Sequence, residues 1–286
     1  MDKECFDVVI ESEQGAFSSQ FKGLWRYKDL IFLFVKREFV SKYKQTILGP
    51  AWAVIQPLLT TVVFTVIFGN VAGLGASGVP SFAFYFSGTF LWTFFSGCLT
   101  STANTFISNS GVMGKVYFPR LVMPISTVLS QMISLGIQFA MFIVFDLYYL
   151  FTGQGVKINL FILMTPLLFA QLAMLALGFG VIISALTTKY RDLIMLVSFI
   201  VELWKYMSPI AYDMFNMGVL APGGRFYALY MLNPATPIVN VFRFAYLGIG
   251  QIDWLFYVVS WITTIVLFII GVFMFNKVER TFMDTI

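Results

Sequence analysis

Histidine is missing from all 286 residues of this chain. The imidazole is the commonest general base, the commonest metal ligand and the usual partner of a nucleophilic serine or cysteine. Its absence excludes histidine-dependent membrane acyltransferases and metalloproteases. Cysteine is also scarce: Cys5 falls in a polar stretch and Cys98 in an apolar run, so neither indicates a disulfide framework or a metal site.

A phosphate-binding loop is missing as well. The nearest fragment, residues 111–116 (GVMGKV), lacks the required glycine spacing and the Ser or Thr that would hold Mg²⁺. The chain is therefore not expected to hydrolyse ATP alone. If it pumps, its energy comes from a partner subunit or from an ion gradient.

Charge is the third shortage, since only 11% of residues are charged while 59% are hydrophobic. Soluble domains have roughly 25% charged residues, and about 20 consecutive apolar residues suffice to span a bilayer. Long charge-free runs predict an all-α membrane protein with six transmembrane helices, because β-barrel strands would alternate in short segments. We place these spans at about 51–73, 82–107, 121–146, 158–187, 193–212 and 254–276.

The distribution of positive charge predicts the orientation. Of the 18 lysines and arginines, 14 fall on the side that holds both termini, and short cytoplasmic segments are enriched in them. We therefore expect a cytoplasmic N-terminal segment 1–50, a transmembrane domain 51–276 and a cytoplasmic tail 277–286. The net charge of +4 fits this topology and anionic lipid without any nucleic acid, and the acidic first twenty residues do not read as a signal peptide.

Residues 27–45 mix apolar and basic positions and are too charged to span a membrane. They predict an amphipathic helix in the cytoplasmic interface, whose basic residues are Lys36, Arg37, Lys42 and Lys44. A simple anchor on anionic lipid and a docking site for a cytoplasmic subunit both remain open.

Five short motifs occur in order along the chain. They are residues 42–52 (KYKQTILGPAW) with Pro57, 115–120 (KVYFPR) with Pro124, 190–193 (YRDL), 208–212 (SPIAY), and Asn233 and Pro234 with Arg243. In this order and spacing they resemble the polysaccharide-exporting ABC transporter permeases of the ABC-2 type, closest to Wzm-type O-antigen export permeases. The similarity covers about residues 25–250.

This resemblance implies a homodimer of permeases over two copies of an ABC ATPase subunit, in the bacterial inner membrane. ATP and Mg would bind to the partner subunit, so the chain itself would be no enzyme and would hold no cofactor or metal. An undecaprenyl-linked polysaccharide, O-antigen in the closest relatives, would pass outward along a channel between the permeases. Capsule and teichoic-acid polymers are the substrates of related exporters.

Three sets of residues are candidates for function. The loop 108–120 resembles the coupling helix that contacts the ATPase, through Lys115, Tyr117, Phe118 and Arg120, although an ordinary positive-inside loop would look similar. The segment 213–253, with Asn233, Pro234 and Arg243, is predicted to form a re-entrant or short-helix element near the channel exit, the alternative being a loop on the outer surface. The channel candidates are Tyr85, Phe86, Phe90, Trp92, Glu202 and Lys205.

The channel candidates have a competing interpretation. Aromatic rings stack on sugars, yet packing or lipid contact explains most membrane aromatics one by one. Glu202 and Lys205 lie three apart on one helix face and could line a channel or lock the fifth span to its neighbours. Three other function classes compete. A gradient-driven transporter is disfavoured by the lack of sequence repeats, and an ABC permease for small lipophilic molecules by the order of the motifs. A membrane transferase is disfavoured by the missing catalytic residues.

Overall fold

The computed structural model describes residues 26–113, 118–187, 190 and 192–281. Every regular element within these ranges is helical, which confirms the predicted all-α class. The helices are α2 Lys28–Tyr43, α3 Trp52–Phe64, α4 Ser81–Ala103, α5 Thr105–Met113, α6 Val122–Phe151, α7 Thr165–Thr187, α8 Leu193–Tyr206, α9 Tyr227–Met231, α10 Ala235–Leu247 and α11 Trp254–Thr281.

Short 3-10 and π turns extend two of these helices. A 3-10 turn Gly49–Ala51 precedes α3 and a π turn Thr65–Val71 continues it, while a 3-10 turn Leu160–Met164 leads into α7. With these extensions, five stretches of the described chain are long and apolar enough to cross a membrane: Gly49–Val71, Ser81–Ala103, Val122–Phe151, Leu160–Thr187 and Trp254–Lys277. They agree with five of the six predicted spans.

The predicted fifth span is the exception. Helix α8 has 14 residues and ends at Tyr206, six residues before the predicted end. At about 1.5 Å per residue it is shorter than the roughly 30 Å hydrocarbon core. The helix ends because Pro209 disfavours helical backbone at the residue before it. Residues 207–213 continue in turns rather than helix.

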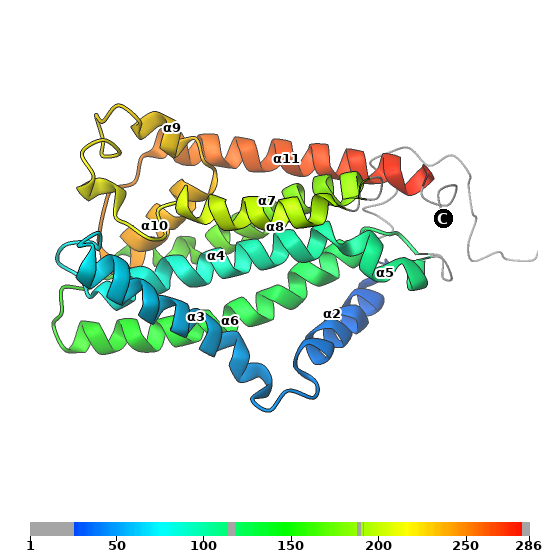
Figure 1. Ribbon diagram of the computed structural model, residues 1–286, viewed down its shortest axis with the longest axis horizontal. Coiled ribbons are helices and arrows are strands. Elements are labelled where there is room, and N and C mark those ends of the chain that lie inside the picture. The colour runs from blue at the N-terminus through cyan, green and yellow to red at the C-terminus, as the bar shows by residue number, and fades with distance from the viewer. Residues whose placement is uncertain (1–25, 114–117, 188–189, 191, 282–286) are drawn as a thin grey trace, which may run out of the picture.

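The long helices form one bundle (Figure 1) in which α3, α4, α6, α7, α8 and α11 alternate in direction along the chain. The helices α2 and α5 lie at the end where α11 finishes, and α9 lies at the opposite end. Helix α4 is central, since it contacts α3, α6, α7, α8 and α10. Its inner surface is built from side chains that solvent does not reach, including Phe84, Tyr85, Phe86, Phe90 and Phe95.

Glycines let three helix backbones approach closely. A Cβ on Gly178 of α7 would lie 2.9 Å from the backbone nitrogen of Phe268 in α11, and a Cβ on Gly271 would lie 2.8 Å from the carbonyl oxygen of Gly178. On the other side of α7, a Cβ on Gly180 would lie 2.6 Å from Thr102 of α4. Small residues serve this purpose in membranes, where helix association depends on close van der Waals contact.

Replacing Gly178 with leucine tests this close packing. The new side chain would meet backbone atoms that cannot rotate away, so we expect Gly178→Leu to destabilise the bundle by about 3 kcal/mol. The measurement is the thermal unfolding midpoint of the purified chain in detergent. Gly136→Leu is the matched control, because a Cβ at Gly136 of α6 would meet nothing within 4 Å. Equal midpoints for the two variants would contradict the packing argument.

Candidate functional site

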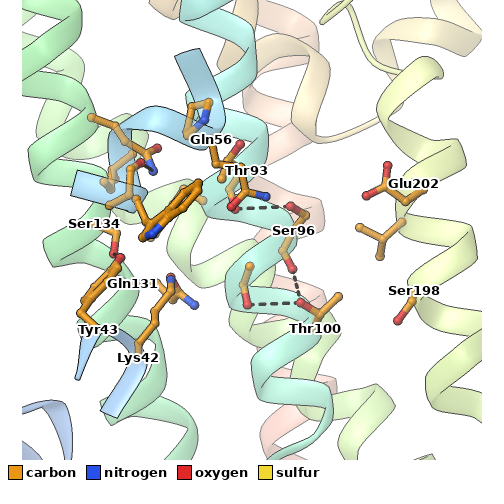
Figure 2. Close-up of a pocket in the computed structure, with 18 residues that line it drawn as sticks. Lys42, Tyr43, Gln56, Thr93, Ser96, Thr100, Gln131, Ser134, Ser198 and Glu202 are labelled. Atoms are coloured by element: carbon orange, nitrogen blue, oxygen red, sulfur yellow. Dashed lines mark hydrogen bonds between the residues drawn. The ribbon is translucent and has the colours of Figure 1, made fainter. Parts of the chain in front are cut away.

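A polar cavity of about 450 Å³ opens beside the central helix α4. Its walls come from the end of α2 and from α3, α4, α6 and α8 (Figure 2). The polar residues that line it are Lys42, Tyr43, Gln56, Thr93, Ser96, Thr100, Gln131, Ser134, Gln138, Ser198 and Glu202. Such a cavity stands out, because apolar residues otherwise dominate these helices.

Helix α4 contributes hydroxyl groups at helical spacing. Thr93, Ser96 and Thr100 follow one another at three- and four-residue steps, so they share one face of the helix. Each hydroxyl donates to a carbonyl of its own helix: Thr93 to Thr89 at 2.8 Å and Thr100 to Ser96 at 2.7 Å, for example. These three residues line the cavity, and a hydroxyl that donates one hydrogen bond can still accept another.

Helix α6 contributes amides and a hydroxyl on one face. The Gln131 amide oxygen accepts from the Lys42 ammonium at 3.2 Å, and the Ser134 hydroxyl bonds the Tyr43 hydroxyl at 3.2 Å. Gln138 donates to the carbonyl of Ala53 at 2.8 Å. That carbonyl needs a donor from elsewhere because the residue four positions later is Pro57, which has no N–H. The proline in α3 thus fixes how α3 sits on α6.

Two further walls complete the cavity. Trp52 at the start of α3 is 45% exposed and faces it. Across the cavity, Ser198 and Glu202 of α8 face α4 in Figure 2. Lys205 lies one turn further along α8, with its ammonium 4.7 Å from the centre of the Phe64 ring, so a cation–π contact ties α8 to α3.

The predicted aromatic channel residues have another place. Tyr85, Phe86 and Phe90 are fully buried within the chain, and Trp92 is 4% exposed. The ring of Phe90 lies 5.5 Å from that of Phe142 in α6 and 5.5 Å from that of Phe242 in α10. In this conformation these four side chains pack the core, and none of them lines the polar cavity beside α4. Their burial favours the packing interpretation of the single rings, and a channel role for the set stays a prediction.

The predicted coupling residues divide into two groups. Lys115 and Tyr117 lie outside the described residues. Phe118 and Arg120 are buried, at 5% and 8% exposure, and the Phe118 ring lies 5.8 Å from the ring of Phe34 in α2. They are therefore not exposed handles for a partner. The four predicted basic residues are all exposed: Lys36, Arg37 and Lys42 lie in α2, and Lys44 follows its last residue. Arg37 and Lys42 also border cavities.

The segment 213–253 is held against the bundle by a buried arginine. Arg243 of α10 donates to Ser87 at 3.1 Å and to the carbonyls of Phe84, Pro209 and Ile210, and its guanidinium lies 3.7 Å from the centre of the Phe84 ring. Two of these acceptors, the carbonyls of Pro209 and Ile210, belong to the non-helical residues after α8 and take donors from Arg243 in place of backbone N–H groups. Gly88 makes room, because a Cβ there would lie 2.7 Å from this guanidinium.

Asn233 also bonds to the residues around the end of α8. Its amide oxygen accepts from the Trp204 indole at 3.1 Å and from the backbone of Ala235 at 3.2 Å. Its amide nitrogen donates to the carbonyl of Met207 at 3.1 Å and to Ser208 at 2.9 Å. Pro234 follows at the start of α10. Asn233 and Arg243 thus share one task, which is to fix the non-helical residues after α8.

Nothing in the described part of the chain suggests a metal centre, because no group of three or more Cys, Asp or Glu side chains lies where it could hold an ion. The cavity offers hydroxyls, amides and one carboxylate, but no pairing of a nucleophile with a base. The cavity is therefore suited to binding polar groups by hydrogen bonds.

Sequence comparison now decides the family. The sequence model of the ABC-2 type transporter family matches residues 29–247, well over half of the chain. The chain belongs to the ABC-2 type transporter family.

Individual relatives of this ABC-2 chain agree. It is 26% identical over 259 residues to the O-antigen export system permease protein RfbA of Klebsiella pneumoniae, covering 90% of this chain and 94% of the relative. It is 27% identical over 194 residues to the protein of the same name from Myxococcus xanthus, covering 68% and 72%. Transporter permeases, not enzymes, make up this family, which confirms the predicted class.

Of the polar residues that line the cavity, the sequence prediction named Glu202 as a channel candidate and Lys42 as a residue of the interface helix, and missed the others. A signal was present, because Thr93, Ser96 and Thr100, and likewise Gln131, Ser134 and Gln138, repeat at helical spacing inside charge-free runs. Polar residues that recur on one face of a transmembrane helix usually face the bundle interior or a watery cavity.

Removing the Arg243 side chain tests the role given to it. Arg243→Met would leave buried carbonyls without donors, so we expect it to lower the free energy of unfolding by about 3 kcal/mol. The thermal unfolding midpoint in detergent measures the loss. The control is Arg225→Met, since Arg225 is an exposed arginine of the same outer segment. A midpoint for Arg243→Met equal to that of the control would refute the role.

Proposed function

We propose that this chain is the transmembrane permease subunit of an ABC exporter that moves a lipid-linked polysaccharide, O-antigen in the first instance, from the cytoplasm to the outer face of the bacterial inner membrane. The observation that carries the proposal is a polar cavity in the apolar bundle of an ABC-2 family member. Relatives that align over 90% of the chain are named O-antigen export permeases. Their substrate is extended to this chain as part of the proposal.

The chemistry of the cavity suits sugar. Hydroxyl and amide groups exchange hydrogen bonds with sugar hydroxyls without binding one of them tightly, which a polymer in transit requires. The exposed ring of Trp52 offers an apolar surface on which a sugar ring can stack. Trp52 therefore takes the role that was predicted for the aromatic residues of the second span. Glu202, at the far wall, remains a channel candidate, and Lys205 beside it is the other.

Six transmembrane spans fit this function, with α8 as the fifth. Residues 207–213 extend α8 through the remaining depth of the membrane, held by Arg243 and Asn233. The end of the bundle with α2 and α5 would be cytoplasmic, because lysine and arginine are concentrated there. The segment 213–253, with the short helices α9 and α10, would form the outer, re-entrant element, and both termini would lie in the cytoplasm.

The assembly would be a homodimer of this chain with two ABC ATPase subunits, which would bind ATP and Mg. Helices α3 and α8 border the cavity and expose large apolar side chains such as Val63 and Phe199, which a second permease could cover. The predicted channel between two permeases would then include the cavity of each.

Helix α2 would lie in the cytoplasmic interface and link the ATPase to the bundle. It exposes apolar Phe32 and Leu33 together with Lys36, and exposed Lys44 follows its end, a combination that suits the boundary between lipid and water. The loop that includes Lys115 and Tyr117 would contact the ATPase. Phe118 would pass its movement to α2 through the ring of Phe34.

The test is export in the host. After deletion of the gene, finished polysaccharide should accumulate on its lipid carrier inside the cell and disappear from the surface. Antibody labelling of intact and lysed cells measures both pools. Unchanged surface polysaccharide would contradict a polysaccharide substrate and favour an ABC permease for small lipophilic molecules. Capsule or teichoic-acid polymer trapped inside the cell would support the export mechanism and identify a different polymer as the substrate.

Complementation of the deletion strain then tests the cavity. Gln56→Leu combined with Thr93→Val removes two polar groups from its walls at nearly constant volume, and we expect surface polymer to fall about fivefold. The matched control is Gln251→Leu with Thr152→Val: both residues are exposed outside the cavity, and Thr152 bonds the carbonyl four residues back as Thr93 does. Equal export by the two double variants would mean that the polymer does not use this cavity.

A further inference from the structure

A second cavity, of about 550 Å³, lies between α2, the α4–α5 junction and α6. It is within the usual size range of ligand sites, roughly 300–1,000 Å³. Lys42 and Gln131 line this cavity as well as the first one, so the two adjoin at this pair. It lies toward the end of the bundle where α2 and α5 are found.

This second cavity holds two positive charges and one negative charge, all from α2. The side chains are Arg37, Lys42 and Glu38. Arg37 donates to the amide oxygen of Asn109 at 3.1 Å, and Lys42 donates to that of Gln131 at 3.2 Å. Both cations thus have neutral amides as hydrogen-bond acceptors, and the oxygens of an anion would form stronger, charge-assisted hydrogen bonds with them.

Glu38 is the internal counter-ion of the two cations. Its carboxylate is half-buried and accepts a hydrogen bond from Thr127 of α6. Burial raises the pKa of this carboxyl, against the smaller lowering effects of Thr127, Arg37 and Lys42. The carboxylate is therefore poorly stabilised where it is, and an anion with stronger hydrogen-bonding oxygens would compete with it for both cations.

Neutral donors complete the lining. Ser101, Ser108 and Ser126 bring hydroxyls and Asn104 brings an amide from α4, α5 and α6. Two cations surrounded by small hydroxyl groups match a group with several oxygens and more than one negative charge, as a phosphate or diphosphate has. A sugar without charge would gain nothing from Arg37 and Lys42.

We propose that this cavity binds the phosphate-bearing headgroup of a lipid, with Arg37 and Lys42 holding the phosphate oxygens in place of their present amide acceptors. The inference deepens the proposed function, because a polysaccharide on a lipid carrier is joined to it through phosphate. The headgroup would bind at the cytoplasmic end while the sugar enters the adjoining cavity past Lys42. The phosphate could belong to the lipid carrier or to a membrane phospholipid.

The experiment measures binding of inorganic pyrophosphate to the full chain in phosphatidylcholine nanodiscs by titration calorimetry. We expect binding by the wild type, and at least about tenfold weaker binding by Arg37→Gln combined with Lys42→Gln. The matched control, Arg26→Gln with Lys28→Gln, removes one arginine and one lysine that are exposed and line neither cavity. Its affinity should stay within about twofold of the wild type.

Two more variants separate binding from damage to the fold. Arg37→Lys with Lys42→Arg keeps both charges and should restore most of the affinity. Glu38→Gln removes the competing carboxylate and should tighten binding by about threefold or more, whereas a merely structural Glu38 would give weaker binding or none. The proposal is overturned if the wild type does not bind pyrophosphate, or if the charge-removing variant and its control bind equally.

The source of the phosphate follows from the lipid. If adding phosphatidylglycerol to the nanodiscs weakens pyrophosphate binding by the wild type but not by the charge-removing variant, the phospholipid headgroup occupies the site. If phosphatidylglycerol has no such effect while geranyl diphosphate competes with pyrophosphate, the site selects a prenyl carrier. Both results support a phosphate site. Polysaccharide export does not enter this measurement. If the wild type exports polysaccharide but does not bind pyrophosphate, this inference alone is overturned and the proposed function stands.

Discussion

A polar group in the hydrocarbon of a bilayer needs a partner, because each one left unsatisfied costs several kcal/mol. This constraint accounts for most of the specific contacts in the bundle. Threonines bond the carbonyl one turn back in their own helix, Gln138 serves the carbonyl that Pro57 leaves without an N–H, and Arg243 serves those after the end of α8. In each case a side chain replaces a missing backbone donor or satisfies itself locally.

The polar cavity gathers polar side chains around open volume. Thr93, Ser96 and Gln56 point into open volume, which in a membrane is stable only when it holds water or a polar solute. The aromatic core lies further along the same face of α4, since Phe86, Phe90 and Thr93 follow one another at helical spacing. It has no such volume, because its rings lie 5–6 Å apart. The face of α4 thus changes along its length from a tightly packed aromatic stretch to a polar stretch that borders the cavity.

The sequence predicted the fold to the extent that hydropathy and charge determine it. The span expected at 51–73 is Gly49–Val71, and the helical class follows from the long apolar runs. It did not predict that α8 stops at Tyr206, although Pro209 gave the signal, nor which side of α4 faces the cavity. Rotation of a helix about its axis depends on packing. The contacts of Phe90 with Phe142 and Phe242 set this rotation for α4, and Thr93, three residues later on the same face, borders the cavity. The domain limits at residues 50 and 277 stay a prediction.

The central claim is that polysaccharide passes through the polar cavity. It is tested most directly by placing a photo-cross-linking benzoylphenylalanine at Ser96, inside the cavity, and at Val144, which is 61% exposed on the outer surface of α6. Cells that make the polymer are irradiated, and the purified chain is probed with antibody against the polysaccharide. The account predicts a polymer adduct from Ser96 and none from Val144. Adducts from neither position, or equally from both, would contradict it.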